Sequence, residues 1–387
     1  MTLRAVSAPH RLARPVSQEV HEFFGASFGA LVATALVTWN LASVIPVFLA
    51  TITLAAVARY FLVRFSMPGI LWLTGAGLGC VMTSLWGTLF IVEAGLPPLL
   101  TALAFAALAL TLFAFLANLV ASIAREAVLT HERWRLPVAI PTSDPRAARL
   151  KVSLHLACYA EPPEIVMETM NRLAAQDYDN FEVLVCDNNT KDEALWRPLE
   201  AHCARLNAQL GKECFRFFHV DPLPGAKAGA LNFLLPLTAP DAQIIGVIDA
   251  DYYSRSDFLS RLLPFFANPK LGYIQTPHDY RDYEGNDYLT ACYWEYMPVN
   301  KVDYPGVSEY GGAFTIGTMC LMRKEALEKA GGWAEWCLTE DSEVSVRLRK
   351  VGYEGLYFGE TFGRGLIPET FDDYKKQRFR WTAGPVQ

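Results

Sequence analysis

The sequence predicts an α/β domain with a mostly parallel sheet, preceded by a region of membrane-spanning helices. Of its 387 residues, 52% are hydrophobic and only 19% are charged, against roughly 25% charged in ordinary globular proteins. The charges are unevenly distributed, because residues 1–124 carry few of them. After residue 150, short apolar runs alternate with helical patterns, which is typical of β-α-β units.

The composition excludes three classes of protein. A chain this hydrophobic is not intrinsically disordered, because disorder requires low hydrophobicity and high net charge. Eight cysteines in 387 residues are too sparse for a small disulfide scaffold, and they form no pair with zinc-ligand spacing. A formal net charge of −6 argues against a nucleic-acid-binding surface. We therefore expect no nucleic-acid partner.

The N-terminal region, residues 1–124, contains three runs without a charged side chain. A membrane-spanning helix needs ~20 apolar residues. The second and third runs therefore hold one helix each, and the first is long enough for two, with a turn expected at Asn40, Ser43 and Pro46. We expect about four transmembrane helices and a lipid bilayer as partner; the alternative is a set of helices buried in a large soluble core. The runs are Phe23–Ala58, Phe65–Val92 and Ala94–Ala124.

The basic residues predict the orientation of these helices, because Lys and Arg favour cytoplasmic loops. Four helices place every basic cluster on one side and Glu93 on the other, whereas three helices break this pattern. We expect a multi-pass protein of the bacterial inner (plasma) membrane, with a proline-containing juxtamembrane linker at 125–150 and a cytoplasmic domain at 151–387. The basic residues are Arg4, Arg11, Arg14, Arg59, Arg64, Arg125, Arg133 and Arg135.

From Lys151 onward, apolar runs that predict strands alternate with patterns that predict helices. Parallel sheets bind ligands beyond the carboxyl ends of their strands, so we expect the chemistry there. The expected strands are Val152–Cys158, Phe181–Cys186, Phe215–Val220 and Ile244–Ile248, and the expected helices are Glu164–Ala175, Glu193–Leu210 and Ala228–Leu235.

Two aspartates follow the last of these strands. Asp249 and Asp251 are two residues apart, and such residues point to the same side of an extended chain. Their charges repel unless a cation or hydrogen bonds neutralise them. Carboxylates suit Mg²⁺ or Mn²⁺, which bridge to substrate phosphates. The pair predicts a metal–diphosphate site; the alternatives are a solvated turn and a dehalogenase-type nucleophile.

Two further motifs lie near strand ends. Asp187 either accepts hydrogen bonds from a base or ribose, or caps a turn. The small residues around Lys227 let a backbone approach a ligand, and Lys227 itself provides a point charge for a phosphate. This loop lacks the spacing of a Walker phosphate loop, so an ordinary turn before a helix is the alternative.

A motif of three polar residues opens a helical stretch near residue 340. In Thr339-Glu340-Asp341, Asp341 is a candidate general base that removes a proton from an attacking hydroxyl. The alternative is a helix cap followed by acids that the helix dipole stabilises.

The last motif is Gln377, Arg380 and Trp381. Arg binds diphosphate through charge-assisted hydrogen bonds, and Trp offers a flat face to a sugar ring. An amphipathic helix on the membrane surface is the alternative, and both interpretations can hold at once.

The order of these motifs resembles that of the membrane-bound family 2 glycosyltransferases, which include cellulose, chitin and hyaluronan synthases. The resemblance covers about residues 150–387 and implies a GT-A-type nucleotide-sugar-binding domain with helices on both faces of the sheet. Residues 185–193 and 224–232 further resemble the cellulose-synthase-like bacterial β-(1,3)/β-(1,6)-glucan glucosyltransferases.

The resemblance implies an inverting transfer of a sugar, glucose from UDP-glucose, to a growing β-glucan, with a membrane or periplasmic partner for export. Direct displacement fits a single carboxylate base without a second nucleophile. The implied roles are donor binding by Tyr159, Glu161, Asp187, Lys227 and Asp249; binding of Mg²⁺ or Mn²⁺ by Asp251 with Asp249; base catalysis by Asp341 with Glu340 and Thr339; and binding of the diphosphate and acceptor by Gln377, Arg380 and Trp381.

The sequence departs from the family in two places. Cellulose synthases carry Phe-Phe-Cys-Gly-Ser near the acceptor, where this chain has Phe314-Thr315-Ile316-Gly317-Thr318. The glycosidic linkage of the product therefore stays open. The chain also ends soon after Trp381, where the family continues into further membrane helices, so we expect it to be cut short. The alternatives are a non-processive transferase to a lipid or small acceptor, an inactive membrane scaffold and a dehalogenase-type phosphatase.

Overall fold

The computed structural model divides the chain into two compact units, residues 1–138 and 139–387. The structure describes residues 24, 25, 27, 28, 31, 32, 35, 41–61, 67–130, 149–309 and 311–387.

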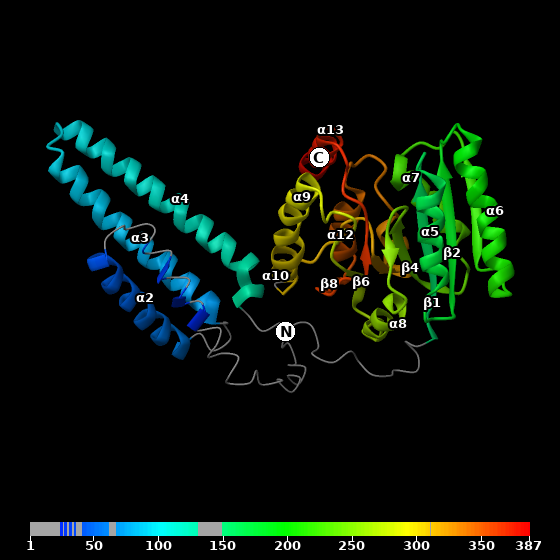
Figure 1. Cartoon of the computed structure of the whole chain (residues 1–387), viewed down its shortest axis with the longest axis horizontal. Coiled ribbons are helices and arrows are strands. Elements are labelled where there is room, and N and C mark those ends of the chain that lie inside the picture. The colour runs from blue at the N-terminus through cyan, green and yellow to red at the C-terminus, as the bar shows by residue number, and fades with distance from the viewer. Residues whose placement is uncertain are drawn as a thin grey trace. The chain divides into compact units, whose positions relative to one another are not determined.

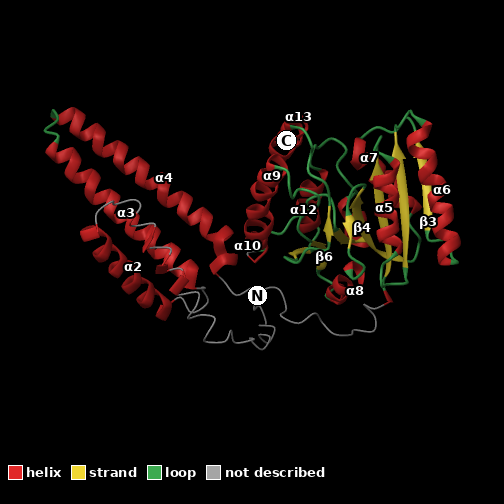
Figure 2. Ribbon diagram, viewed as in Figure 1, coloured by secondary structure: helices red, strands yellow, loops and turns green. Residues whose placement is uncertain are grey.

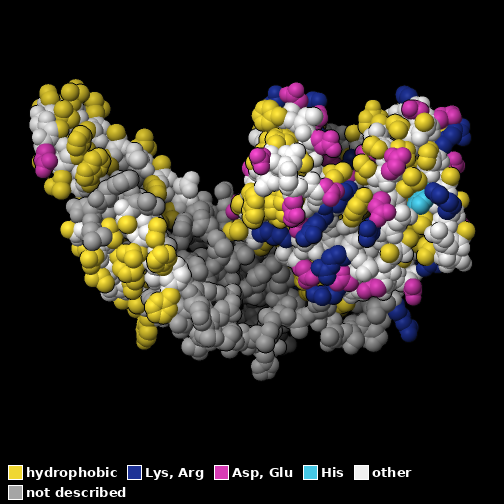
Figure 3. Space-filling view, viewed as in Figure 1, with side chains coloured by type: hydrophobic (Ala, Val, Ile, Leu, Met, Phe, Trp, Pro, Cys, Tyr) yellow, Lys and Arg dark blue, Asp and Glu magenta, His cyan; other side chains and the backbone are white. Residues whose placement is uncertain are grey.

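Among the described residues of the N-terminal unit are three long apolar helices, of which α3 packs against both α2 and α4 (Figure 1). All three are long and apolar enough to cross a membrane. Most of their large side chains are exposed and hydrophobic, as Figure 3 shows. This outward apolar surface favours a bilayer over the alternative of a soluble core. The helices are α2 (Leu41–Phe61), α3 (Met67–Glu93) and α4 (Pro98–Thr130).

The helices predicted from the second and third apolar runs are present, but two details of the prediction are wrong. Helix α2 begins at Leu41 and contains Ser43 and Pro46, so the predicted turn does not extend to them. Pro46 costs this helix the backbone hydrogen bond to residue 42, but the long apolar run around it keeps the segment helical. Helix α4 continues to Thr130, so residues 125–130 are helical rather than linker. The good helix formers Ala, Arg and Glu explain this extension.

Part of the topology prediction lies outside the described residues. The first of the four expected helices falls mostly there, as does the rest of the expected linker, and the side chain of Arg125 is not described. The four-helix arrangement and its orientation therefore stay predictions. The other basic residues outside the description are Arg4, Arg11, Arg14, Arg64, Arg133 and Arg135.

The C-terminal unit is built on a seven-stranded sheet in the order β3-β2-β1-β4-β7-β6-β8 (Figure 2). Strands β1 to β4 are mutually parallel where they pair, and β7 runs antiparallel to both β4 and β6. A separate two-stranded sheet pairs β5 with β9. The strands are β1 (Lys151–Cys158), β2 (Phe181–Asn188), β3 (Phe215–Val220), β4 (Ala242–Asp249), β5 (Tyr253–Ser254), β6 (Leu271–Gln275), β7 (Cys320–Arg323), β8 (Glu354–Tyr357) and β9 (Gly363–Arg364).

Helices cover both faces of this sheet, as the predicted fold class requires. Phe218 and Val220 pack with α7 on one face. On the other face, Trp196 of α6 stacks on Phe217 and His219. These two residues alternate with Phe218 and Val220 along β3, so they point to the opposite face. The helices are α5 (Pro163–Ala174), α6 (Glu193–Leu210), α7 (Ala226–Leu234), α8 (Phe258–Leu262), α9 (Asp287–Pro298), α10 (Tyr304–Glu309), α11 (Lys324–Ala330), α12 (Glu340–Lys350) and α13 (Phe371–Ala383).

The apolar core explains why the first half of this unit was predictable. All four predicted strands and three predicted helices are present within two residues of their expected bounds. Strand β2 is buried along its whole length, which is why it reads as a continuous apolar run. A second core cluster joins α9 to α13 through Tyr296, Tyr374 and Trp381, and so holds the last motif against the rest of the unit.

Candidate active site

The carboxyl ends of β1, β2 and β4 meet at one edge of the sheet. Ala157 is in register with Cys186 on one side and with Asp249 on the other. Asp187 and Asp249 therefore flank the end of β1, and the loop that follows β1 carries Tyr159 and Glu161. The parallel sheet thus brings together the donor-binding residues that the sequence predicted.

Asp249 and Asp251 lie at the end of β4 in a partly enclosed, acidic environment. The backbone N–H of Asp249 donates to Thr318 Oγ1 at 2.9 Å. Asp251 Oδ2 accepts a hydrogen bond from the backbone N–H of Leu366 at 2.7 Å. Burial, together with the charge of Asp249, raises the pKa of Asp251 to about 6. Binding a cation would relieve this repulsion.

Lys227 lies at the start of α7 and reaches two sides of the site. Its ammonium group pairs with the carboxylate of Asp249 and donates to the carbonyl oxygen of Gly317 at 2.8 Å. Burial alone would lower its pKa, but the neighbouring carboxylates of Asp249, Glu340 and Asp341 hold the pKa above its usual value. Lys227 therefore stays charged among the acids.

Asp341 lies in the first turn of α12, beside Glu340. Burial and the adjacent charge of Glu340 raise its pKa to about 7, although Lys227 opposes this shift. Burial also raises the pKa of Glu340. A half-buried carboxylate with a pKa near neutrality has the properties of a general base. Thr339 precedes the helix, but its side chain makes no capping hydrogen bond.

Asp187 is held by three neighbouring side chains. Its Oδ1 accepts from His219 Nδ1 at 2.8 Å, and its Oδ2 accepts from Thr190 Oγ1 at 2.7 Å. The thiol of Cys158 lies 3.8 Å from Oδ2. Thr190 Oγ1 in turn accepts from the backbone N–H of Ala160 at 2.9 Å, which ties the loop after β1 to the end of β2.

The loop after β1 places a carboxylate and an aromatic ring at this edge. Tyr159 is 59% exposed. Glu161 accepts a hydrogen bond from the backbone N–H of Tyr159. Burial raises the pKa of Glu161 to about 7, and the charges of Asp249 and Asp251 contribute. Glu161 is therefore within electrostatic reach of the predicted metal ligands.

The three predicted residues of α13 do not share one environment. Gln377 accepts a hydrogen bond from Tyr296 Oη, and Trp381 packs edge-on against the same tyrosine. Arg380 is exposed. Its positive charge offsets part of the rise that burial causes in the pKa of Glu340, so it acts on the site at longer range. Trp381 thus faces the interior of the site, and Arg380 remains open to solvent.

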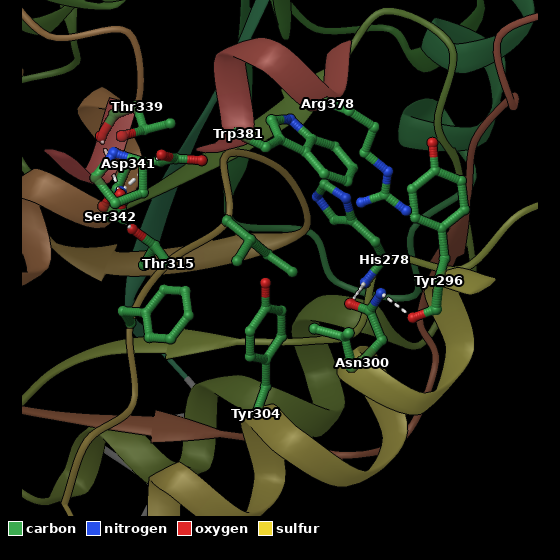
Figure 4. A pocket seen from close by; sticks show the side chains of 14 residues that line it. His278, Tyr296, Asn300, Tyr304, Thr315, Thr339, Asp341, Ser342, Arg378 and Trp381 are labelled. Atoms are coloured by element: carbon green, nitrogen blue, oxygen red, sulfur yellow. Dashed lines mark hydrogen bonds between the residues drawn. The ribbon is translucent and has the colours of Figure 1, made fainter. Parts of the chain in front are cut away.

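A cavity of about 180 Å³ adjoins Asp341. Figure 4 shows Tyr304 pointing into it from α10, with Trp381 entering from α13 and Asp341 at one side. Phe314 and Ile316 also line it, from the stretch where the sequence departs from cellulose synthases. The cavity therefore combines aromatic faces with one carboxylate, which suits a sugar ring carrying a hydroxyl.

The residues at the end of β4 fit a divalent metal ion whose coordination shell would be completed by a substrate phosphate. In the described ranges, no three His, Cys, Asp or Glu side chains converge on one metal position. Mg²⁺ and Mn²⁺ are commonly held by one or two carboxylates together with substrate phosphates. Asp251, with its raised pKa, and Asp249 provide that pair.

Sequence reasoning missed several residues around this site. His278, Tyr304 and Arg378 line the cavity, and the guanidinium of Arg378 lies 4.1 Å from the ring centroid of Tyr296. The helical phase of α13 could have identified Arg378, because residues 374, 377, 378 and 381 share one face. His278 offered no such signal.

Comparison with known proteins gives one family. The profile of the family described as "Glycosyltransferase like family 2" matches residues 148–384. Glucomannan 4-beta-mannosyltransferase 1 of Cyamopsis tetragonoloba is 31% identical over 217 residues, which are 54% of this chain and 40% of that protein. The UDP-forming cellulose synthase catalytic subunit of Pseudomonas fluorescens is 28% identical over 243 residues, which are 61% of this chain and 31% of that protein.

A solved structure has the same fold. A mannosyltransferase from Pyrobaculum calidifontis, in complex with GDP-Man and Mn²⁺, superimposes with a TM-score of 0.55 at 20% identity over 73% of each chain. The sequence match to the two curated relatives covers at most two fifths of their length.

Proposed function

Because this chain belongs to glycosyltransferase family 2, in which it is cellulose-synthase-like, we propose that it transfers glucose from UDP-glucose to a growing β-glucan with inversion at the anomeric carbon. The observation that carries this proposal is the position of Asp341. Its carboxylate adjoins the aromatic cavity, and it shares Lys227 with Asp249 on the donor side. The family assignment excludes the dehalogenase-type phosphatase.

The chemistry follows from this geometry. An acceptor hydroxyl in the cavity attacks the anomeric carbon of the donor, and its proton passes to Asp341. The bond from that carbon to the diphosphate breaks, and UDP leaves with the electron pair. The raised pKa of Asp341 makes it a stronger base than an ordinary carboxylate. One displacement on one carbon inverts its configuration.

The charge on the departing diphosphate needs compensation. Lys227 is the nearest cation to Asp249, and Arg380 lies exposed on α13. Mg²⁺ or Mn²⁺ held by Asp251 and Asp249 would supply further positive charge there. Asp251, Asp249 and Lys227 therefore orient the diphosphate in the proposed reaction.

The hydrogen bonds of Asp187 support uracil as the base of the donor. A carboxylate has about four acceptor positions. Thr190 uses one position on Oδ2 and His219 uses one on Oδ1, while the one thiol proton of Cys158 lies between Oδ2 and the carbonyl oxygen of Cys186. The position that remains on Oδ1 matches the single imide N–H of uracil. Guanine presents two adjacent N–H groups and would need both oxygens.

The cavity can accommodate a sugar acceptor. Trp381 and Tyr304 offer flat faces, and Thr339, Ser342 and Asp341 add polar groups at one end. Aromatic faces with a few convergent polar groups are typical of small-molecule sites, and a sugar ring offers both an apolar face and hydroxyl groups to such a lining.

Incubation of membranes containing the protein with radiolabelled UDP-glucose and Mn²⁺, followed by product sizing, tests the proposal. We expect long or cyclic glucan, loss of product with EDTA, and no incorporation from GDP-mannose. A single-sugar lipid product would instead establish the non-processive transferase. Equal synthesis by wild type and Asp341→Asn, in membranes that also contain a complete synthase, would establish the inactive scaffold.

A further inference from the structure

The side chain of His219 on β3 is fixed against Asp187 on β2. The two residues are register partners in adjacent parallel strands, so their side chains leave the same face of the sheet. Nδ1 of His219 lies 2.8 Å from Oδ1 of Asp187. Because a carboxylate oxygen only accepts, Nδ1 carries the proton and donates it. The carboxylate therefore selects the tautomer of the imidazole.

An aromatic stack holds the same imidazole from the side. The ring of Trp196 on α6 lies 4.3 Å from that of His219, with an angle of 11° between the planes. The guanidinium of Arg197 lies 4.7 Å from the indole, and Phe217 stacks on that indole at 6.3 Å. The imidazole is therefore restricted both by its hydrogen bond and by packing against α6.

The environment of Asp187 differs on its two sides. Thr190 and Cys158 hold Oδ2 from the β1 side, next to the loop that carries Tyr159. His219 holds Oδ1 from the β3 side. The side chain of Asp187 is only 3% exposed, whereas that of His219 is 25% exposed. The carboxylate cannot rotate without losing one of these bonds, so His219 fixes the direction of its one remaining acceptor position.

We propose that His219 is a positioning residue for the donor nucleotide, acting through Asp187, with Trp196 as its support. It orients the single free acceptor position of Asp187 toward the nucleobase imide and so sets the affinity for uridine nucleotides. This inference rests on the proposed function and deepens it. His219 itself makes no contact with the reacting atoms, so it influences donor binding and not the chemical step.

Titration of UDP in the presence of Mn²⁺ into the full chain in detergent tests this inference. We expect His219→Leu to weaken UDP binding roughly tenfold, which is the effect of losing one hydrogen bond to a charged group. His219→Asn restores binding, because its amide N–H lies close to the position of Nδ1. His219→Gln does not, because its amide lies one bond farther away. Phe218→Leu is the matched control and leaves binding unchanged, because Phe218 lies next to His219 on β3 but packs against α7 on the other face of the sheet, away from Trp196 and Asp187.

Kinetics separate positioning from a general structural role. We expect His219→Leu to raise KM for UDP-glucose and to leave kcat unchanged. Unchanged UDP binding in His219→Leu, or equal losses in His219→Leu and Phe218→Leu, would overturn the inference. Should His219→Leu fail to fold, equal affinities of the Asn and Gln variants would overturn it instead. If wild-type protein binds neither UDP nor GDP, the proposed function itself fails, and this inference fails with it.

Discussion

The ammonium group of Lys227 donates a hydrogen bond of 2.8 Å to the carbonyl oxygen of Gly317. The same group pairs with Asp249. One side chain thus connects the strand that carries the predicted metal ligands to the loop beside the acceptor cavity. Removing it would disturb both halves of the proposed site.

Lys227→Met removes the cation that compensates the negative charges of Asp249, Glu340 and Asp341. We expect kcat/KM for UDP-glucose to fall on the order of 10²-fold, because a preorganised charge next to the leaving group is lost. Lys227 also lowers the pKa of Asp341, so the acid limb of the pH profile moves to higher pH. Lys329→Met is the control, because it breaks an exposed pair with Glu325 on α11 and a hydrogen bond to Tyr353 but touches none of the acids of the site. Equal rates for the two variants would contradict the assignment.

Asp341→Asn removes the proposed base while keeping its shape. We expect kcat to fall by roughly 10²- to 10⁴-fold, the usual contribution of a positioned general base. UDP binding should be preserved, because Asp187 and Asp249 are unchanged. A radiolabelled transfer assay and UDP titration measure the two quantities separately. Loss of UDP binding together with kcat would instead indicate a structural role for Asp341.

The raised pKa values predict a specific dependence on pH. Asp341 and Glu161 have pKa values of about 7. A base must be deprotonated, so kcat/KM rises with pH through this window and levels off above it. Because more than one carboxylate titrates, the slope below pH 6 exceeds tenfold per unit. Glu161→Gln should reduce that slope, and an unchanged profile would show that Glu161 does not contribute.

Gly317→Ala tests how closely the loop before β7 approaches Asp341, the proposed base. A Cβ at Gly317 would lie 2.8 Å from Asp341 Oδ2 and 3.4 Å from Lys227 Nζ. We expect kcat to fall by about 10²-fold, as for a small displacement of a catalytic group. Gly352→Ala is the control, because its φ of +94° matches the +92° of Gly317 and nothing lies near its Cβ. Both variants should lose similar stability, about 1–2 kcal/mol, and only the first should lose activity.

The elements that could be predicted are those with a periodic pattern of apolar residues. Strands β1 to β4 are apolar runs with helical patterns between them, and the parallel arrangement then brings Asp187 and Asp249 to one edge of the sheet. The two-residue strands β5 and β9 carry no such pattern, because each exists only through pairing with the other. The turn expected through Pro46 was wrong, because the surrounding apolar run favours a continuous helix.

The contacts within the site could not be predicted from spacing. Lys227 and Asp249 are 22 residues apart, and Lys227 and Gly317 are 90 apart, so only the fold brings them together. Asp187 was assigned to the nucleotide from its motif alone. Its restraint by His219 depends on the pairing of β2 with β3, which the sequence does not specify.

Strand β7 gives the acceptor side of the site a different origin from the donor side. Because β7 runs against β4, its first residue Cys320 lies near the end of β4, in register with Val247. The loop that precedes β7 therefore reaches the site, whereas the donor side is built from loops that follow strands. Within this loop, Gly317 and Thr318 are tied to Lys227 and Asp249. Ile316 lines the cavity instead, so its side chain can change without breaking these two hydrogen bonds. A substitution at such a cavity-lining position can alter the shape of the acceptor cavity while the strands that hold Asp187 and Asp249 stay unchanged.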